Sequence, residues 1–138
     1  MLFKNLKMVI ISLIPNIIPL IIAAGIMGFL GIPLKPSSAL VFSIVFGISV
    51  DYSIHFLAKF KNELLENDLK NSISNTINQT GKSMIFTSFI LFFGFIIFAF
   101  SNFGGTIVLG ILTSVILFVA MITNLTLLPS IILHFYKK

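Results

Sequence analysis

The sequence predicts an all-α integral membrane protein, a single transmembrane domain built as a four-helix bundle. Three observations lead to this fold class: the composition, four long apolar segments, and the placement of the lysines. Of the 138 residues, 57% are hydrophobic and only 9% are charged, whereas soluble globular domains carry about 25% charged residues. The mean hydropathy of +1.12 also disfavours a water-soluble core.

The apolar segments set the expected helices. They cover about residues 8–30, 39–60, 83–100 and 106–133, and each meets or approaches the ~20 residues that a spanning helix needs. Helix-breaking residues separate the first pair at Gly31–Pro36 and the last pair at Ser101–Gly105. Asn16 lies between two prolines, which predicts a kink in the first span.

The connection at 62–79 is polar but carries apolar residues at a spacing of four, which places them on one helix face. These residues are Leu65, Leu69, Ile73 and Ile77. We therefore predict a short amphipathic helix lying at the cytoplasmic interface.

The lysines orient the four spans. Eight of the nine fall before the first span, between the second and third, or after the fourth: Lys4, Lys7, Lys59, Lys61, Lys70, Lys82, Lys137 and Lys138. With four spans these three places share one side of the membrane, and only Lys35 is left on the other. The positive-inside rule then predicts that both termini are cytoplasmic, in a multi-pass protein of the inner (plasma) membrane.

Several function classes have no support in the sequence. The chain has no cysteine, and no nucleotide-binding glycine loop, zinc pattern or nucleophile elbow appears. We therefore expect neither an enzyme nor a cofactor or metal site. The lysines are not clustered on one face, which disfavours nucleic acid as a partner. The first span is longer than the ~7–15-residue core of a signal peptide and contains prolines, which favours a retained span.

Asp51 is the most informative residue, because it interrupts the apolar segment 39–60. It lies about 18 Å from the start of that segment at ~1.5 Å per residue, close to the middle of a hydrocarbon core about 30 Å thick. A charge at that depth costs roughly 2.5–3.5 kcal/mol and is a functional-site candidate by default. Three roles fit: a proton or cation carrier, a structural hydrogen-bonding group, or the lining of a wet pore. Removal from water favours the neutral carboxyl form, and the carrier role is the one we favour.

Neighbouring polar residues give Asp51 possible partners. Gly47, Asp51 and His55 are spaced by four and share one helix face, and Gly47 would let another helix approach closely. His55 either relays protons towards the cytoplasm or simply sits near the interface. Tyr52 points about 100° away from Asp51, towards a second helix or a second acid. Further candidates for relay support are Thr87, Ser88 and Asn124.

These residues form an ordered set that resembles the MMPL-type exporters of the resistance–nodulation–cell division (RND) superfamily. The set begins with the glycine-xxx-aspartate pattern at Gly47–Asp51, followed by Tyr52. It continues with Thr87-Ser88, Phe93-Gly94-Phe95, Ser101-Asn102-Phe103, Leu109-Gly110-Ile111-Leu112 and Leu127-Leu128-Pro129. The resemblance covers nearly the whole chain from Ile32 onward.

The resemblance implies the transmembrane part of a proton-driven exporter of lipids or other hydrophobic molecules. Asp51 would be the proton-relay carboxylate with Tyr52 as its neighbour, and a proton or sodium gradient would replace a cofactor. The chain would correspond to the last four spans of one transporter half, and its partners would be the bilayer, the other half and an extracytoplasmic porter domain. Two alternatives stay open. One is a non-transporting scaffold or lipid- and sterol-sensing bundle in which Asp51 is structural, and the other is a small four-span exporter acting as a homodimer.

Overall fold

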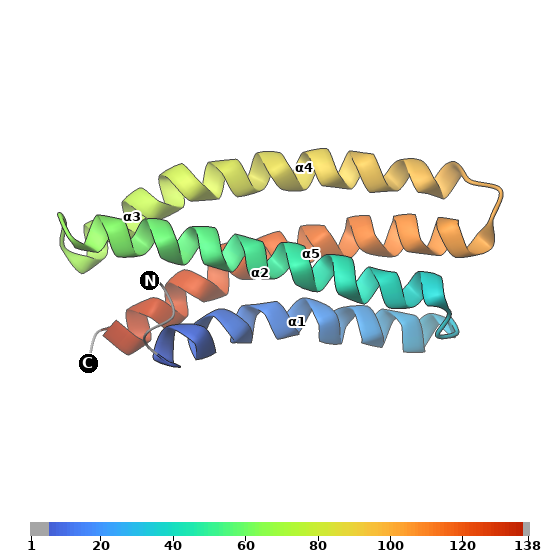
Figure 1. Cartoon of the computed structure of the whole chain (residues 1–138), viewed down its shortest axis with the longest axis horizontal. Helices are drawn as coiled ribbons and strands as arrows, with labels where there is room; N and C mark the ends of the chain where they lie inside the picture. Colours follow the sequence, from blue (N-terminus) through green and yellow to red (C-terminus); the bar gives the residue numbers. More distant parts are fainter. Residues whose placement is uncertain (1–5, 137–138) are drawn as a thin grey trace.

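The computed structural model describes residues 6–136, and every regular element in this range is a helix (Figure 1). In chain order the elements are α1 Leu6–Leu30, α2 Pro36–Leu64, α3 Leu69–Thr76, the π-helical turn η1 Ile77–Gly81, α4 Lys82–Ile96, the 3₁₀ turn η2 Ile97–Phe100, and α5 Gly104–Tyr136. Four helices are long and apolar enough to cross a membrane, the third running without a break from Leu69 to Phe100. The predicted all-α four-helix bundle is confirmed.

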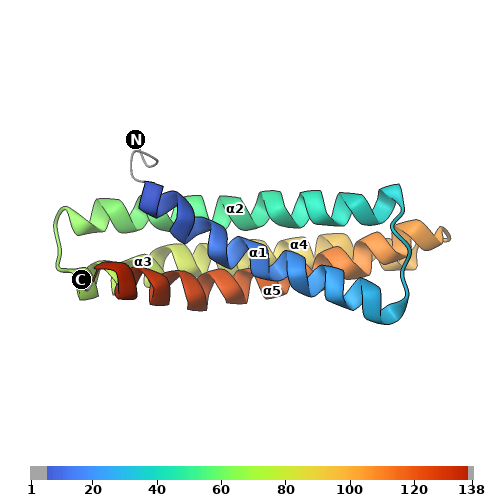
Figure 2. The same ribbon diagram turned by 90° about the horizontal axis from the view of Figure 1, so that it is seen from below.

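The four long helices run side by side along one axis, and α1 crosses the others obliquely (Figure 2). α5 packs against α1, α2 and α4, so it forms the centre of the bundle, with α4 and α1 on opposite sides (Figure 1). The start of α1 and the end of α5 lie at the same end as the α2–α3 turn. Lys7, Lys59, Lys61, Lys70 and Lys82 occur there, and we name it the lysine-rich end. Lys4, Lys137 and Lys138 lie outside the described residues.

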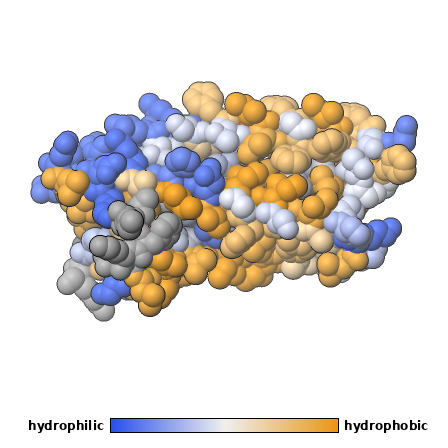
Figure 3. Space-filling view, in the orientation of Figure 1, coloured by the Kyte–Doolittle hydropathy of each residue, from blue (hydrophilic) through white to orange (hydrophobic). Residues whose placement is uncertain are grey.

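The surface agrees with a membrane location. Apolar side chains cover the middle of the molecule in Figure 3, whereas hydrophilic ones concentrate at the lysine-rich end. The third span, Leu69–Phe100, is the least buried of the four, with 11% of its most apolar window buried inside the bundle. Its outward residues include Phe86, Ile90 and Phe93, which are 62–71% exposed and would contact lipid.

The connection between the second and third spans differs from our prediction. α2 continues to Leu64, and the short helix α3 within 62–79 begins only at Leu69 and continues through η1 into α4. The predicted short helix is therefore present over a shorter range and is joined to the third span. Only part of the apolar row is used for packing: Ile73 is 6% exposed and joins the core, whereas Leu65 is 82% exposed. A bond from Asn75 Nδ2 to Glu63 Oε2 of 3.0 Å ties α3 to the end of α2.

Glycine is required at two places in the framework. Gly31 ends α1 with φ +68°, and the Ile32 N–H donates to the Met27 carbonyl at 2.9 Å, which is the Schellman closure that favours glycine. Gly110 lets α4 and η2 approach the α5 backbone closely, because an added Cβ would lie 2.7 Å from the Phe95 carbonyl oxygen and 2.7 Å from Phe98 Cβ. α1 itself continues through Pro15 and Pro19 as one helix.

Candidate functional site

Asp51 lies in the middle of α2. It is about 22 Å from Pro36 and about 20 Å from Leu64 at ~1.5 Å per residue. Since the hydrocarbon core is about 30 Å thick, a transmembrane α2 holds this carboxylate deep within the bilayer.

The chain does not bury Asp51 within its own bundle. The Asp51 side chain is 62% exposed, and its recorded partner is His55, whose Nε2 lies 3.3 Å from Asp51 Oδ1. Gly47 is on the same exposed face, and nothing lies within 4 Å of a Cβ placed there. The shared face of Gly47, Asp51 and His55 is therefore present as expected. However, no helix of the described chain packs against it, and no serine or threonine of a neighbouring helix bonds Asp51.

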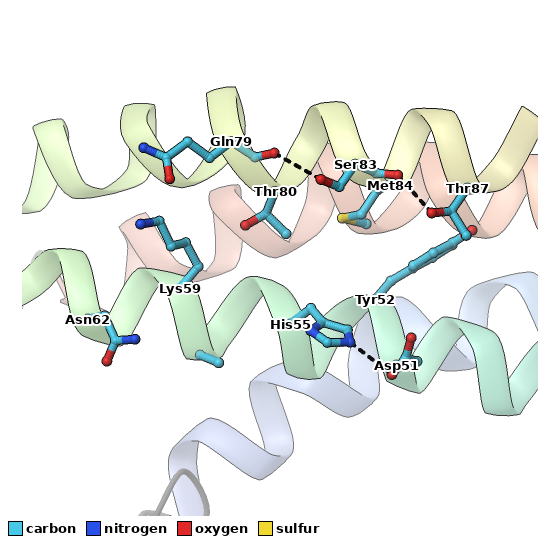
Figure 4. A pocket seen from close by; sticks show the side chains of 11 residues that line it. Asp51, Tyr52, His55, Lys59, Asn62, Gln79, Thr80, Ser83, Met84 and Thr87 are labelled. Carbon is cyan, nitrogen blue, oxygen red and sulfur yellow. Dashed lines mark hydrogen bonds and ion pairs between the residues drawn. The ribbon is translucent and has the colours of Figure 1, made fainter.

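A polar groove of about 620 Å³ runs beside Asp51 between α2 and the start of the third span (Figure 4). α2 contributes Asp51, Tyr52, His55, Ala58, Lys59 and Asn62, and the opposite wall is formed by Gln79, Thr80, Ser83, Met84 and Thr87. In Figure 4 Tyr52 and Lys59 extend from α2 towards the third span, whereas Asp51 and His55 lie along α2, joined by the dashed contact. The groove thus places polar side chains from the depth of Asp51 to the lysine-rich end.

The π-helical turn η1 supplies Gln79 and Thr80 near the end of the groove. Such turns are rare and often occur at functional sites. On the other wall, Lys59 Nζ lies 2.7 Å from Glu63 Oε1. This ion pair compensates the lysine charge next to the groove.

Tyr52 points to the third span and not to Asp51. Tyr52 is 4% exposed, and its hydroxyl is 2.7 Å from the Ser88 hydroxyl on α4. Buried tyrosine hydroxyls usually have a hydrogen-bond partner, and here the partner is a serine that we singled out from the sequence. Tyr52 and Ser88 therefore link α2 to α4 directly at the depth of Asp51.

Thr87 and Ser88 are neighbours in sequence but have different positions. Thr87 lines the groove, is exposed, and donates to the Ser83 carbonyl at 2.9 Å. Serine and threonine hydroxyls in membrane helices commonly donate to the carbonyl four residues earlier in this way. Thr87 is thus a polar wall of the groove, whereas Ser88 is a contact of Tyr52.

Asn124 is not in the groove. It is fully buried on the other side of α2, where its Oδ1 accepts from Ser53 Oγ at 2.6 Å and its Nδ2 donates to Ser49 Oγ at 3.1 Å. Asn16 of α1 completes this cluster, since its Oδ1 accepts from Ser49 at 2.6 Å and from Ser53 at 3.1 Å. We name these four residues the asparagine–serine cluster. It joins α1, α2 and α5.

Sequence reasoning missed Ser49 and Ser53. Their spacing of four, two residues to either side of Asp51, defines a second polar face of α2. This spacing is the signal that could have found them. The kink predicted at Asn16 stays a prediction; its Nδ2 donates to the Ser12 carbonyl of the same helix at 2.6 Å. Elsewhere in the described part of the chain, buried Thr113 Oγ1 lacks a hydrogen-bond partner.

Metal-binding side chains do not gather in the described range 6–136: it contains no group of three or more His, Cys, Asp or Glu that could hold an ion. The chemistry that the groove offers is acid–base chemistry at Asp51 and His55, with hydroxyl and amide groups along its walls.

Comparison with known proteins adds the family. No curated protein and no solved structure matches the chain significantly. A family model does match, that of the MMPL family, over residues 1–136. This match covers nearly the whole chain, including the four apolar helices and the groove. The chain therefore belongs to the MMPL family.

Proposed function

We propose that this chain is the transmembrane part of a proton-driven exporter of lipids or other hydrophobic molecules, with Asp51 as the proton-relay carboxylate. One observation carries the proposal: a titratable side chain at the middle of a spanning helix opens into a polar groove that extends to the lysine-rich end. Membrane helices rarely hold a carboxylate at that depth unless it serves a pathway for ions or protons.

The groove supplies a path for the proton. From Asp51 to Asn62 is about 16 Å along the helix, and polar groups line this length on both walls. A proton bound to an Asp51 oxygen removes its charge, and release of that proton along the groove to the lysine-rich end restores the charge. His55 is 3.3 Å from Asp51, close enough to accept and return the proton. Each change of charge alters the cost of keeping this face of α2 in the bilayer, which drives α2 to repack.

The exposed carboxylate also indicates a partner. A charged group that faces the bilayer interior is costly, so we infer that the other half of the transporter covers the face of Gly47, Asp51 and His55. Because Gly47 has no side chain, a partner helix can come close there. An extracytoplasmic porter domain would hold the hydrophobic substrate. The positive-inside rule supports a cytoplasmic location for the lysine-rich end and both termini, in a protein of the inner membrane.

The test replaces Asp51 by Asn in the full transporter. We expect Asp51→Asn to reduce proton-coupled export to the background of vesicles without transporter, because an amide cannot exchange a proton. Asp68→Asn is the matched control, since it makes the same change in the exposed turn before α3 and should leave export unchanged. Both variants should reach the membrane in wild-type amounts. Undiminished export by Asp51→Asn would rule out the relay role.

A second candidate is a lipid- or sterol-sensing scaffold that transports nothing. It is favoured by the direct pairing of Asp51 with His55, which gives the carboxylate a structural role. In that case the wild-type assembly shows no proton-dependent export, and Asp51→Asn changes its stability and not its flux.

A further inference from the structure

A second candidate site lies at the end of the bundle opposite the lysine-rich end. Two cavities there share the lining residues Ile32 and Val108, so they adjoin each other. The first has a volume of about 360 Å³ and is lined on its polar side by Lys35, Ser37 and Ser38. The second, of about 210 Å³, is lined only by apolar side chains of α1, α5 and the turn after α1.

Local hydrogen bonds and one glycine shape the polar cavity. The Lys35 N–H donates to Ser38 Oγ at 2.8 Å, and this hydroxyl donates to the Lys35 carbonyl at 2.8 Å, which fixes the turn that carries the lysine. Gly105 at the start of α5 faces Ser37: an added Cβ would lie 3.0 Å from Ser37 Oγ. Glycine at this position therefore keeps the two helix starts close together around the cavity.

The two cavities are ordered along the membrane normal. The polar cavity includes Gly104 at the very start of α5, and the apolar cavity extends along α5 to Val115. These residues are about 16 Å apart at ~1.5 Å per residue, roughly half of a hydrocarbon core of about 30 Å. A polar cavity at the membrane boundary thus leads into an apolar one directed towards the bilayer centre.

The polar cavity carries a single uncompensated positive charge. Lys35 is exposed, and all four acidic residues of the sequence, Asp51, Glu63, Glu66 and Asp68, lie further along the chain. Even the nearest, Asp51, is about 24 Å away along α2. The ammonium group therefore favours an anionic ligand, and the adjoining apolar cavity favours one with a hydrocarbon chain.

We propose that this site binds one anionic membrane lipid, with its head group at Lys35 and a hydrocarbon chain in the cavity between α1 and α5. The site uses no residue of the Asp51 groove and lies at the other end of the bundle. Lipid binding there is consequently independent of the relay function and can be tested without transport.

The experiment uses tryptophan fluorescence, because the chain contains no tryptophan. Phe29→Trp places a reporter next to Leu30, a lining residue of the apolar cavity, at a position that is 92% exposed. Phe100→Trp is the matched control, an 87% exposed phenylalanine at the same end of the bundle on the α4 side. The protein is placed in phosphatidylcholine vesicles containing brominated phosphatidylglycerol or brominated phosphatidylcholine, and quenching gives the relative lipid affinity at each reporter.

We expect phosphatidylglycerol to be preferred about fivefold at Phe29→Trp, the order of effect that one lysine near an anionic lipid gives. Lys35→Gln should abolish this preference, and Phe100→Trp should show none. Equal quenching by the two lipids at Phe29→Trp would overturn the proposal, as would a preference that survives Lys35→Gln or appears equally at Phe100→Trp. Loss of the preference in excess inorganic phosphate, but not in sodium chloride of the same ionic strength, would also overturn it, because the site would then prefer a soluble phosphate to a lipid head group.

Discussion

The asparagine–serine cluster leads to a quantitative prediction about stability. Asn124→Leu keeps a side chain of similar size but removes the acceptor of Ser53 and a donor to Ser49, bonds of 2.6 and 3.1 Å in the structure. Interhelical hydrogen bonds in membranes contribute about 0.6 kcal/mol on average and at most about 1.7 kcal/mol. Two such bonds give an expected loss in the free energy of unfolding of about 1–3 kcal/mol.

The cluster also limits the loss. Ser53 has a second acceptor in Asn16 Oδ1 at 3.1 Å, so it retains one partner when Asn124 is replaced. The measurement is the free energy of unfolding in mixed micelles containing increasing fractions of a denaturing detergent. Thr126→Val is the control, because Thr126 is exposed on the same helix and its hydroxyl donates to the Ile122 carbonyl of its own helix at 2.7 Å; we expect a change within about 0.5 kcal/mol.

A double-mutant cycle with Asn16→Leu completes the test. The two asparagines share both serines, so their losses should not be additive, with a coupling of at least about 0.5 kcal/mol. If Asn124→Leu unfolds like the wild type, or if the two losses simply add, then the cluster does not join the three helices in the way that its geometry indicates.

Two further predictions concern the packing and the exposure of α4. Gly110→Ala in α5 should lower the free energy of unfolding by about 1–3 kcal/mol, because the new Cβ would lie 2.7 Å from the Phe95 carbonyl oxygen of α4. Gly94→Ala is the control and should cause no such loss, because nothing lies within 4 Å of a Cβ placed there. Unfolding in mixed micelles measures both variants, and equal losses would contradict the close approach at Gly110. Since the chain has no cysteine, Thr87→Cys and Ile90→Cys introduce single thiols at two exposed positions of α4. If the groove holds water, a water-soluble thiol reagent should label Thr87→Cys but not Ile90→Cys. Equal labelling of both variants would refute a water-filled groove.

Much of the fold could be predicted because hydropathy and helix breakers act locally. Gly31 ends one helix and the prolines around Lys35 precede the next, whatever the tertiary contacts of this segment are. The four spans follow from such breakers and from the apolar segments between them. The long helix from Leu69 was missed for the opposite reason. Its first turns are polar and have no breaker before Gly81, and they are held by contacts with distant residues, such as that between Asn75 and Glu63.

The site was predictable as a set of residues but not as an arrangement. Helical periodicity correctly groups Gly47, Asp51 and His55, yet α2 has polar residues on two faces, and periodicity does not say which one the bundle covers. The positions of α1 and α5 decide it, because Asn16 and Asn124 bring partners for Ser49 and Ser53. The link between Tyr52 and Ser88 likewise depends on where α4 packs, which the sequence does not encode locally.

The uneven attachment of the four helices has a mechanical consequence. Hydrogen bonds at mid-membrane join α1, α2 and α5 to one another, so these three helices are held together by several bonds at the same depth. Across the α2–α4 boundary, the described residues place one such bond, from Tyr52 to Ser88. α4 instead packs on α5, where Phe89 and Phe92 contact Phe118 and the helices approach closely at Gly110. Widening the groove therefore breaks one hydrogen bond at mid-membrane, whereas separating α2 from α1 and α5 breaks several.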